Sequence, residues 1–311
     1  MEKIATREAY GNALAAIGKE NEKIVVLDAD LSKSTKTSVF AKACPERFFD
    51  MGIAESNMAG TAAGLAIGGN TVFMSSFAMF AVGRCYEIIR NSICYPKLNV
   101  KIAATHAGIT VGEDGGSHQS IEDIALTRVL PNMEVFVPAD GVETAKMVQY
   151  MAANEGPMYL RLGRSGQPVL FDESYEFIPG KFTVMRDGGD VALFACGLMV
   201  GEALKAAETL HEEGISAAVV NASSLKPLDE ATTVAYAQKC GAIVTAEEHS
   251  VIGGLGAAIA QCLVRQRPCP VEFVGVEDRF GQSGRPDELL AAYGLTAAHI
   301  VEKAKAAMAR K

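Results

Sequence analysis

The residues best suited to chemistry lie in one short stretch, from His106 to Gln119. It holds two histidines, twelve residues apart, with two carboxylates and four glycines, in a chain with 5 histidines in all. Imidazoles titrate near neutral pH and can move protons on a substrate, while glycines let the backbone approach a ligand closely. The stretch follows the apolar run Val100–Thr105, so we expect a loop at the C-terminal end of a strand, where open α/β sheets bind ligands. A polar surface turn is the alternative.

Two further features could serve a flat, nitrogen-containing ligand. Glu55 opens a helix rich in glycine and alanine, just after a short strand. Its carboxylate either complements the helix dipole or, if buried among small apolar residues, has a raised pKa and shares a proton with a ring nitrogen. Phe77 and Phe80 follow another strand, and they either pack in the core or clamp a heterocycle.

Polar side chains also follow the first and the last strand of the N-terminal half. Asp30, Ser32 and Ser34 come after the first, and Arg161 and Arg164 come after the last. Each could touch a polar substrate, because strand ends converge at one edge of a parallel sheet. Arg164 suits a phosphate, since a guanidinium binds it bidentately. A surface ion pair of little energetic worth is the alternative for an arginine there.

Apolar runs that alternate with amphipathic segments predict an α/β protein with two doubly wound, mostly parallel sheets. The expected strands are 24–27, 48–50, 71–75, 100–105, 134–138, 158–162, 191–196, 216–221, 242–246 and 271–274. The expected helices are 5–20, with Thr6 as its N-cap, then 51–66, a stretch to about 95, 120–129, 141–153, 198–213, 229–239, 254–265 and 296–307. We predict one domain over 1–165, an interdomain linker over 166–189 and a second domain over 190–311.

Composition excludes several classes of protein. The net charge is −8, and no basic patch stands out to bind nucleic acid. None of the 7 cysteines forms a Cys-x-x-Cys pair, so a disulfide framework or a structural zinc site is not expected. No apolar run is long enough to span a membrane, and we expect a cytoplasmic protein. Glu247–Gly256 lacks the full dinucleotide-binding spacing, and we interpret it as a glycine-rich helix start for close packing.

Several of these runs resemble transketolase. They are Gly52–Ala59, Ser75–Phe80, Thr105–Gln119, Pro131–Val135 and Pro157–Arg164. The resemblance covers nearly the whole chain, but only the C-terminal half of a full-length transketolase, namely the pyrimidine-binding domain plus the C-terminal domain. The Gly-Asp-Gly and asparagine pattern that holds magnesium and a diphosphate in thiamine enzymes is missing. The chain therefore resembles the β subunit of a split transketolase.

The resemblance implies thiamine diphosphate as cofactor, with magnesium ligands on a partner subunit. It implies that Glu55 bonds N1′ of the aminopyrimidine, and that Phe77 and Phe80 line the pyrimidine pocket with Asp30 nearby. The family usually has a third aromatic residue where this chain has Gly83. The pocket would then be completed differently, or by the partner.

The resemblance also implies a role for each polar residue toward a sugar phosphate. His118, with His106, would act on hydroxyl protons, and Asp114 would recognise the donor near C2 or C3. The phosphate would be held by Arg7, Ser34, His106 and Arg164.

The activity implied is transfer of a two-carbon ketol unit from a ketose phosphate to an aldose phosphate, as in the pentose phosphate reactions. A diphosphate-binding α subunit would complete the enzyme, most naturally as an α2β2 heterotetramer. Three alternatives stay open: a 1-deoxyxylulose-5-phosphate synthase-like subunit, a 2-oxoacid dehydrogenase E1 β-like subunit, and a non-catalytic scaffold subunit. His106 favours transketolase over the synthase, and the Asp114–His118 motif is not expected in the dehydrogenase.

Overall fold

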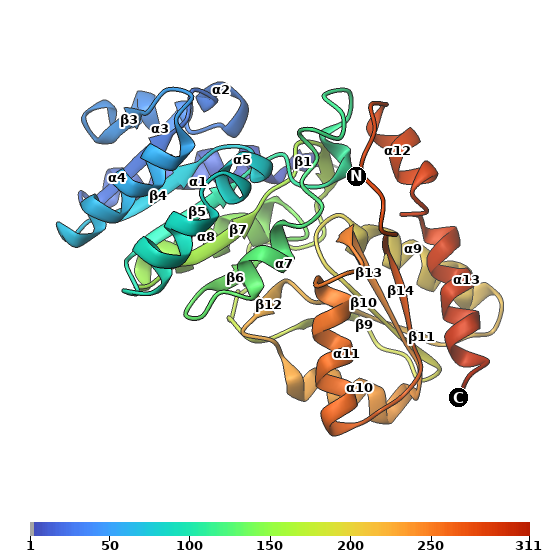
Figure 1. The fold of residues 1–311 in the computed structure, drawn as a ribbon. Coiled ribbons are helices and arrows are strands. Elements are labelled where there is room, and N and C mark those ends of the chain that lie inside the picture. The colour runs from blue at the N-terminus through green and yellow to red at the C-terminus, as the bar shows by residue number, and fades with distance from the viewer. Residues whose placement is uncertain (1–2) are drawn as a thin grey trace.

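Buried strands form the centre of each of the two domains in the computed structural model, which describes residues 3–311 (Figure 1). The first sheet has seven strands in the spatial order β12 (Ser224–Lys226), β6 (Glu134–Phe136), β7 (Met158–Arg161), β5 (Val100–Ala104), β4 (Thr71–Ser75), β2 (Ile24–Asp28) and β3 (Phe48–Asp50). All neighbouring strands in it are parallel except β12, which pairs antiparallel with β6.

The second domain contains a five-stranded sheet. Its order is β14 (Val271–Val276), β13 (Ile243–Ser250), β10 (Val191–Ala195), β11 (Ala217–Asn221) and β9 (Thr183–Arg186). Only β9 is antiparallel to its neighbour. A small antiparallel pair, β1 (Lys3–Ala5) with β8 (Gly166–Pro168), connects the N-terminus to the end of the first domain. The predicted fold class, two mostly parallel α/β sheets, is confirmed.

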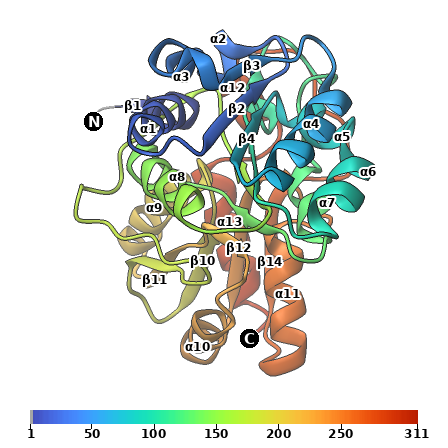
Figure 2. The ribbon, with the colours of Figure 1, turned by 90° about the vertical axis from the view of Figure 1, so that its left-hand side faces the viewer.

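Alternation of side chains along each strand explains why helices cover both faces of the first sheet. In β2, Ile24 and Val26 face one side, while Val25 and Leu27 face the other. The first side is covered by α1 (Thr6–Glu20), α3 (Ser38–Ala43) and α8 (Gly141–Ala153). The second is covered by α4 (Glu55–Ile67), α5 (Ala78–Gly83), a π-helical turn (Ile89–Cys94) and α7 (Asp123–Arg128). Figure 2 shows α1 and α8 on one side of the sheet, and α4, α5 and α7 on the other.

The remaining helices belong to connections and to the second domain. Short ones are α2 (Ser32–Thr35), α6 (Tyr86–Ile88) and the 3-10 turns Pro45–Arg47 and Ile109–Val111. The second domain has α9 (Met199–Glu212), α10 (Glu230–Cys240), α11 (Leu255–Gln266), α12 (Pro286–Ala292) and α13 (Ala297–Met308). Figure 1 places α12 next to the loop that contains Ile109–Val111. Within residues 3–311, no helix is both long and apolar enough to cross a membrane.

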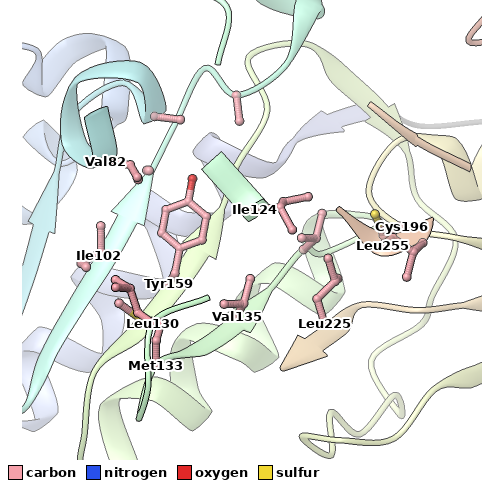
Figure 3. Packing of buried hydrophobic residues seen from close by; sticks show 14 of the residues in the cluster. Val82, Ile102, Ile124, Leu130, Met133, Val135, Tyr159, Cys196, Leu225 and Leu255 are labelled. Carbon is pink, nitrogen blue, oxygen red and sulfur yellow. The ribbon is translucent and has the colours of Figure 1, made fainter. Parts of the chain in front are cut away.

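One hydrophobic core runs without interruption from the first domain into the second. Tyr159 and Ile102 of the first sheet belong to the same buried cluster as Leu225 and Leu255 of the second domain. Figure 3 shows Ile124 of α7 between these two groups. A shared apolar core resists relative movement of the domains, because any opening would expose apolar surface to water.

The structure refines several expectations. Strands β3 and β4 and helix α8 have the predicted bounds, whereas the predicted 166–189 linker holds β8 and β9, and residues 78–95 form three helical pieces instead of one helix. Thr6 does not cap α1, whose N-cap is Ala5. The Thr6 hydroxyl instead accepts a hydrogen bond from Gly163 N at 2.8 Å. The pairing of β1 with β8 brings that amide within reach, and this tertiary bond replaces the local cap.

Candidate active site

The predicted site residues gather at the C-terminal edge of the seven-stranded sheet. Strands β2, β4, β5 and β7 all end there, and the loops that follow them carry most of the polar candidates. Parallel pairing makes this convergence inevitable, because all four strands point the same way. Residues far apart in the sequence therefore become neighbours, as Arg7 and His106 illustrate: 99 positions separate them, yet Nη1 and Nε2 lie 3.4 Å apart.

His106 lies buried at the centre of this edge, with a positive φ of 56°. Its Nε2 faces the guanidinium of Arg7, and its Nδ1 lies 2.8 Å from Oγ1 of Thr105. Because a guanidinium can only donate, Nε2 is the acceptor and the ring proton is on Nδ1. Burial, followed by the neighbouring positive charges, lowers the pKa of His106 to about 3. The ring is therefore neutral at physiological pH.

Aromatic rings join this histidine to the neighbouring strand end. Phe77 stacks on His106 with centroids 3.8 Å apart and on Phe80 at 6.0 Å. His118 approaches Phe80 edge-on at 5.3 Å and Phe77 at 6.3 Å. Phe77 is buried, while Phe80 and His118 are partly exposed. The two phenylalanines thus form an aromatic wall, with both histidines of the loop against it.

Glu55 is the first residue of α4 and is buried, as the sharper interpretation of the sequence requires. Both of its carboxylate oxygens accept hydrogen bonds from Nη1 of Arg84, at 2.8 and 3.0 Å. The Arg84 guanidinium also lies over the Phe80 ring, 4.5 Å from its centroid. Arg84 was not identified as a candidate from the sequence. The residue before it, Gly83, stands where the family usually has a third aromatic residue of the pocket. The side chain one position later covers this part of the aromatic wall.

Positive charge collects on the other side of His106. Nη1 of Arg7 donates to the carbonyl of Ser34 at 2.9 Å. Within residues 3–311, no acceptor lies within hydrogen-bonding distance of the buried Nε of Arg7. Arg164 donates to the carbonyl of Val111 and to Oε2 of Glu113, and its charge acts on both Arg7 and His106. A buried donor without an acceptor, beside a second guanidinium, is the arrangement that an anionic ligand would satisfy.

A buried carboxylate shapes the loop that carries Ser34. Asp28, the last residue of β2, accepts hydrogen bonds from the hydroxyls of Thr35 and Thr37 and from the amide of Leu31. Burial raises its pKa to about 6. The chain then turns at Asp30, which has a φ of 60° and is exposed. The Asp30 amide donates to Oδ1 of Asp50 at 3.0 Å, which ties this turn to the end of β3.

Two other candidates lie apart from the cluster around His106. Asp114 is exposed at the tip of the loop, between two glycines of positive φ, Gly112 and Gly115. Arg161 is buried and donates to both oxygens of Asp123, at 2.8 and 3.2 Å. The idea that Arg161 touches a substrate is therefore replaced by a structural role, because its guanidinium is consumed by the protein.

Comparisons with known proteins identify the family of both domains. Residues 2–168 match the family described as transketolase, pyrimidine binding domain, and residues 180–300 match transketolase, C-terminal domain. A putative transketolase C-terminal section from Methanocaldococcus jannaschii is 49% identical over 96% of this chain and 94% of its own length. A 6-deoxy-6-sulfo-D-fructose transketolase subunit from Clostridium sp. (strain MSTE9) is 42% identical over 98% and 95%. A solved structure, a split gene transketolase described as an inactive β4 tetramer, has a TM-score of 0.92 with 58% identity over 100% of both chains.

Fold, site and sequence together define a thiamine diphosphate-type α/β protein with a pyrimidine-binding domain. The chain belongs to the transketolase family, and it corresponds to the C-terminal section of a split transketolase. Among the residues that the structure describes, no group of three or more His, Cys, Asp or Glu side chains is arranged to hold a metal ion.

Proposed function

We propose that this chain is the catalytic β subunit of a cytoplasmic split transketolase, which moves a two-carbon ketol unit from a ketose phosphate to an aldose phosphate. The observation that carries the proposal is the contact of His106 with both Phe77 and Arg7. Through it, an aromatic wall next to a buried carboxylate adjoins a pair of arginines. A pyrimidine-type cofactor and a phosphorylated sugar would each find suitable partners at adjoining positions.

The residues present fit the pyrimidine half of thiamine diphosphate. Glu55 offers a buried carboxylate that could hold a proton at a ring nitrogen, and Phe77 and Phe80 offer flat apolar surface beside it. When bound, thiamine diphosphate supplies the electron sink that allows a carbon–carbon bond next to a carbonyl to break. Arg84 donates to both oxygens of Glu55, so it would compete with a ring nitrogen for that carboxylate.

The polar residues divide into those for a phosphate and those for hydroxyl groups. Arg7 and Arg164, with Ser34 beside them, would bind the phosphate. His106 is neutral with Nε2 as acceptor, so it suits a sugar hydroxyl once Arg7 has turned to the phosphate. His118 would hold or move a hydroxyl proton, and exposed Asp114 would accept a hydrogen bond from the donor sugar.

The chain would work only with a separate α subunit that binds the diphosphate and magnesium, most naturally as an α2β2 heterotetramer. Each α/β interface would then close one site. The solved relative, described as an inactive tetramer of β chains, supports the need for a second kind of subunit. The identity of that subunit and the assembly are part of the proposal.

The test is ketol transfer from xylulose 5-phosphate to ribose 5-phosphate, with thiamine diphosphate and magnesium. The enzyme is this chain co-purified with the product of its neighbouring gene. Turnover supports the proposal. A folded, cofactor-bound complex that is inactive on these sugars would next be given 6-deoxy-6-sulfo-D-fructose as donor, because the Clostridium relative is described as acting on it and a sulfonate would fit the same arginines. Turnover of pyruvate with glyceraldehyde phosphate instead would contradict the transketolase assignment.

A further inference from the structure

The second domain packs against the loop 106–119. Glu248 of β13 points its carboxylate at the start of this loop, and Oε1 accepts a hydrogen bond from the amide of Thr110 at 2.6 Å. Gly108 has a φ of +82°, and a Cβ at that position would lie 2.3 Å from Cδ of Glu248. The loop therefore rests directly on the carboxylate, and only glycine allows so close an approach.

A second contact fixes the end of the same loop. The side-chain amide of Gln119 donates to the carbonyls of Ile109 and Gly112, at 3.0 and 3.2 Å, and to that of Gln282 in the second domain at 2.9 Å. A Cβ on Gly116 would lie 2.6 Å from the carbonyl oxygen of Gly281. Both ends of the loop are thus set against the second domain, with exposed Asp114 between them.

The surroundings of Glu248 argue against simple space filling. Its backbone carbonyl accepts from Nη2 of Arg161 at 2.9 Å, and Arg161 is paired with Asp123. Burial raises the pKa of Glu248 to about 7, although Arg161 opposes the shift. An apolar side chain would fill the same volume without the cost of burying an ionisable group. The carboxylate instead directs an oxygen at one backbone amide of the loop.

We propose that Glu248 is a positioning residue for the substrate loop: by accepting the Thr110 amide across the domain boundary, it sets the backbone that aims His106, Asp114 and His118. The inference rests on the proposed function for its kinetic consequences, but not for its structural ones. It gives the second domain a part in the active site without any direct contact with substrate.

Three variants of the assembled complex test this role. Glu248→Ala removes the acceptor, whereas Glu248→Gln keeps an oxygen in place for Thr110. Glu247→Ala is the matched control, since Glu247 is the preceding residue of β13 and is also buried, but it accepts hydrogen bonds from the amides of Leu255 and Gly256 at the start of α11. For Glu248→Ala we expect kcat/KM for the ketose donor to fall about tenfold or more, as for a lost buried hydrogen bond. Glu248→Gln should restore most of that loss.

Hydrogen exchange of residues 106–119 provides a readout that does not need activity. Glu248→Ala should speed exchange of the Thr110 amide, while Glu247→Ala should lower the melting temperature and leave both the exchange and kcat/KM of the folded complex unchanged. The proposal is overturned if Glu248→Ala lowers only the melting temperature, or if Glu247→Ala loosens the loop equally. Faster exchange in Glu248→Ala, in a complex whose wild type never turns over a ketose, would retain this inference and reject the proposed function.

Discussion

Two clusters of charged side chains contact the loop 106–119, and they differ in how completely the protein itself satisfies them. In the interdomain cluster, Asp123 accepts from Arg161 and from the hydroxyl of Tyr159, and Arg161 also reaches the carbonyl of Glu248. In the second cluster, which surrounds His106 and forms the candidate site, the buried Nε of Arg7 has no acceptor among residues 3–311. The difference separates charges that hold the structure from charges that, under the proposed function, would bind a ligand.

Exposure and pKa follow the same division. Burial alone would raise the pKa of Asp123, but Arg161 overrides it and keeps that pKa below its usual value. At the site, 52% of the Arg84 side chain is exposed while its partner Glu55 is buried, so Arg84 can turn to water but Glu55 then needs another hydrogen-bond partner. An ion pair in which both side chains are buried supports the structure. In a pair with one exposed side chain, a ligand can replace that exposed partner.

The largest effect should come from breaking the interdomain cluster. Asp123→Ala leaves the Arg161 guanidinium buried without its carboxylate, and we expect a loss of about 3–5 kcal/mol in the free energy of unfolding. Glu113→Ala removes the exposed partner of Arg164 and should cost about 1 kcal/mol or less. Urea denaturation of both variants measures the difference. Equal losses would erase the distinction between the two clusters.

Next in size is the loss of the site carboxylate. Glu55→Ala should lower kcat of the assembled complex by about 10²–10⁴-fold, the range for a group that holds a proton in the reaction. Its melting temperature should change little, because the partner, Arg84, is free to turn to water. A variant that keeps full activity in the complex would favour the non-catalytic scaffold subunit.

Arg7, whose buried Nε has no acceptor among residues 3–311, should matter for substrate and not for stability. Arg7→Met should raise KM for a phosphorylated donor by about 10–100-fold, as for a lost charged hydrogen bond, without lowering the melting temperature. Arg47→Met is the control, since Arg47 donates to the carbonyls of Gly18, Asn21 and Ile24 at the opposite end of β2. It should lower the melting temperature and leave KM unchanged. The reverse pattern would place the phosphate elsewhere.

The buried charge of Glu248 should appear as a pH dependence of stability. Its pKa is raised to about 7, so the folded state binds more protons than the unfolded state below that pH, and stability is lost as the pH rises toward about 7. The charged groups that face it are Arg161 and Asp123. Relative to wild type, Glu248→Gln should therefore gain about 1.4 kcal/mol per pH unit between about pH 5 and 7. Thermal unfolding of both proteins across this pH range measures the change. A stability difference between them that stays constant with pH would contradict the prediction.

The smallest effect concerns Arg84. Because it occupies the oxygens of Glu55 that a ring nitrogen would need, Arg84→Met should bind thiamine diphosphate about three- to tenfold more tightly in the complex, as for removal of a weak competing ion pair. Arg90→Met, in which an exposed bond to Asn91 is lost, serves as control. Calorimetric titration measures the affinity of both variants for thiamine diphosphate. Weaker binding by Arg84→Met would mean that Arg84 forms a wall of the pocket and does not compete for it.

Local patterns were sufficient for ten of the strands and for the neighbourhood of the site, but not for the short strands β1, β8, β9 and β12, which pair at sheet edges or outside the two main sheets. The apolar run Thr71–Ser75 predicts a buried strand, and it is β4 with the predicted ends. The position of His106–Gln119 after a strand placed the loop at the correct edge of the sheet. Glycine-rich Glu247–Gly256 was also interpreted correctly as close packing, since a Cβ on Gly256 would lie 2.4 Å from the ring of Phe273.

The sequence by itself therefore determined most of the two sheets, the edge that carries the candidate site and the residue types gathered there, because all of these depend on periodicity over neighbouring residues. Only the tertiary structure decided which charges face each other. Arg161 and Arg164 are three residues apart, yet one is consumed by Asp123 and the other faces His106. Arg84 on Glu55 and Glu248 under Thr110 join segments 29 and 138 residues apart. Such pairings depend on how whole elements pack, and no local pattern records them.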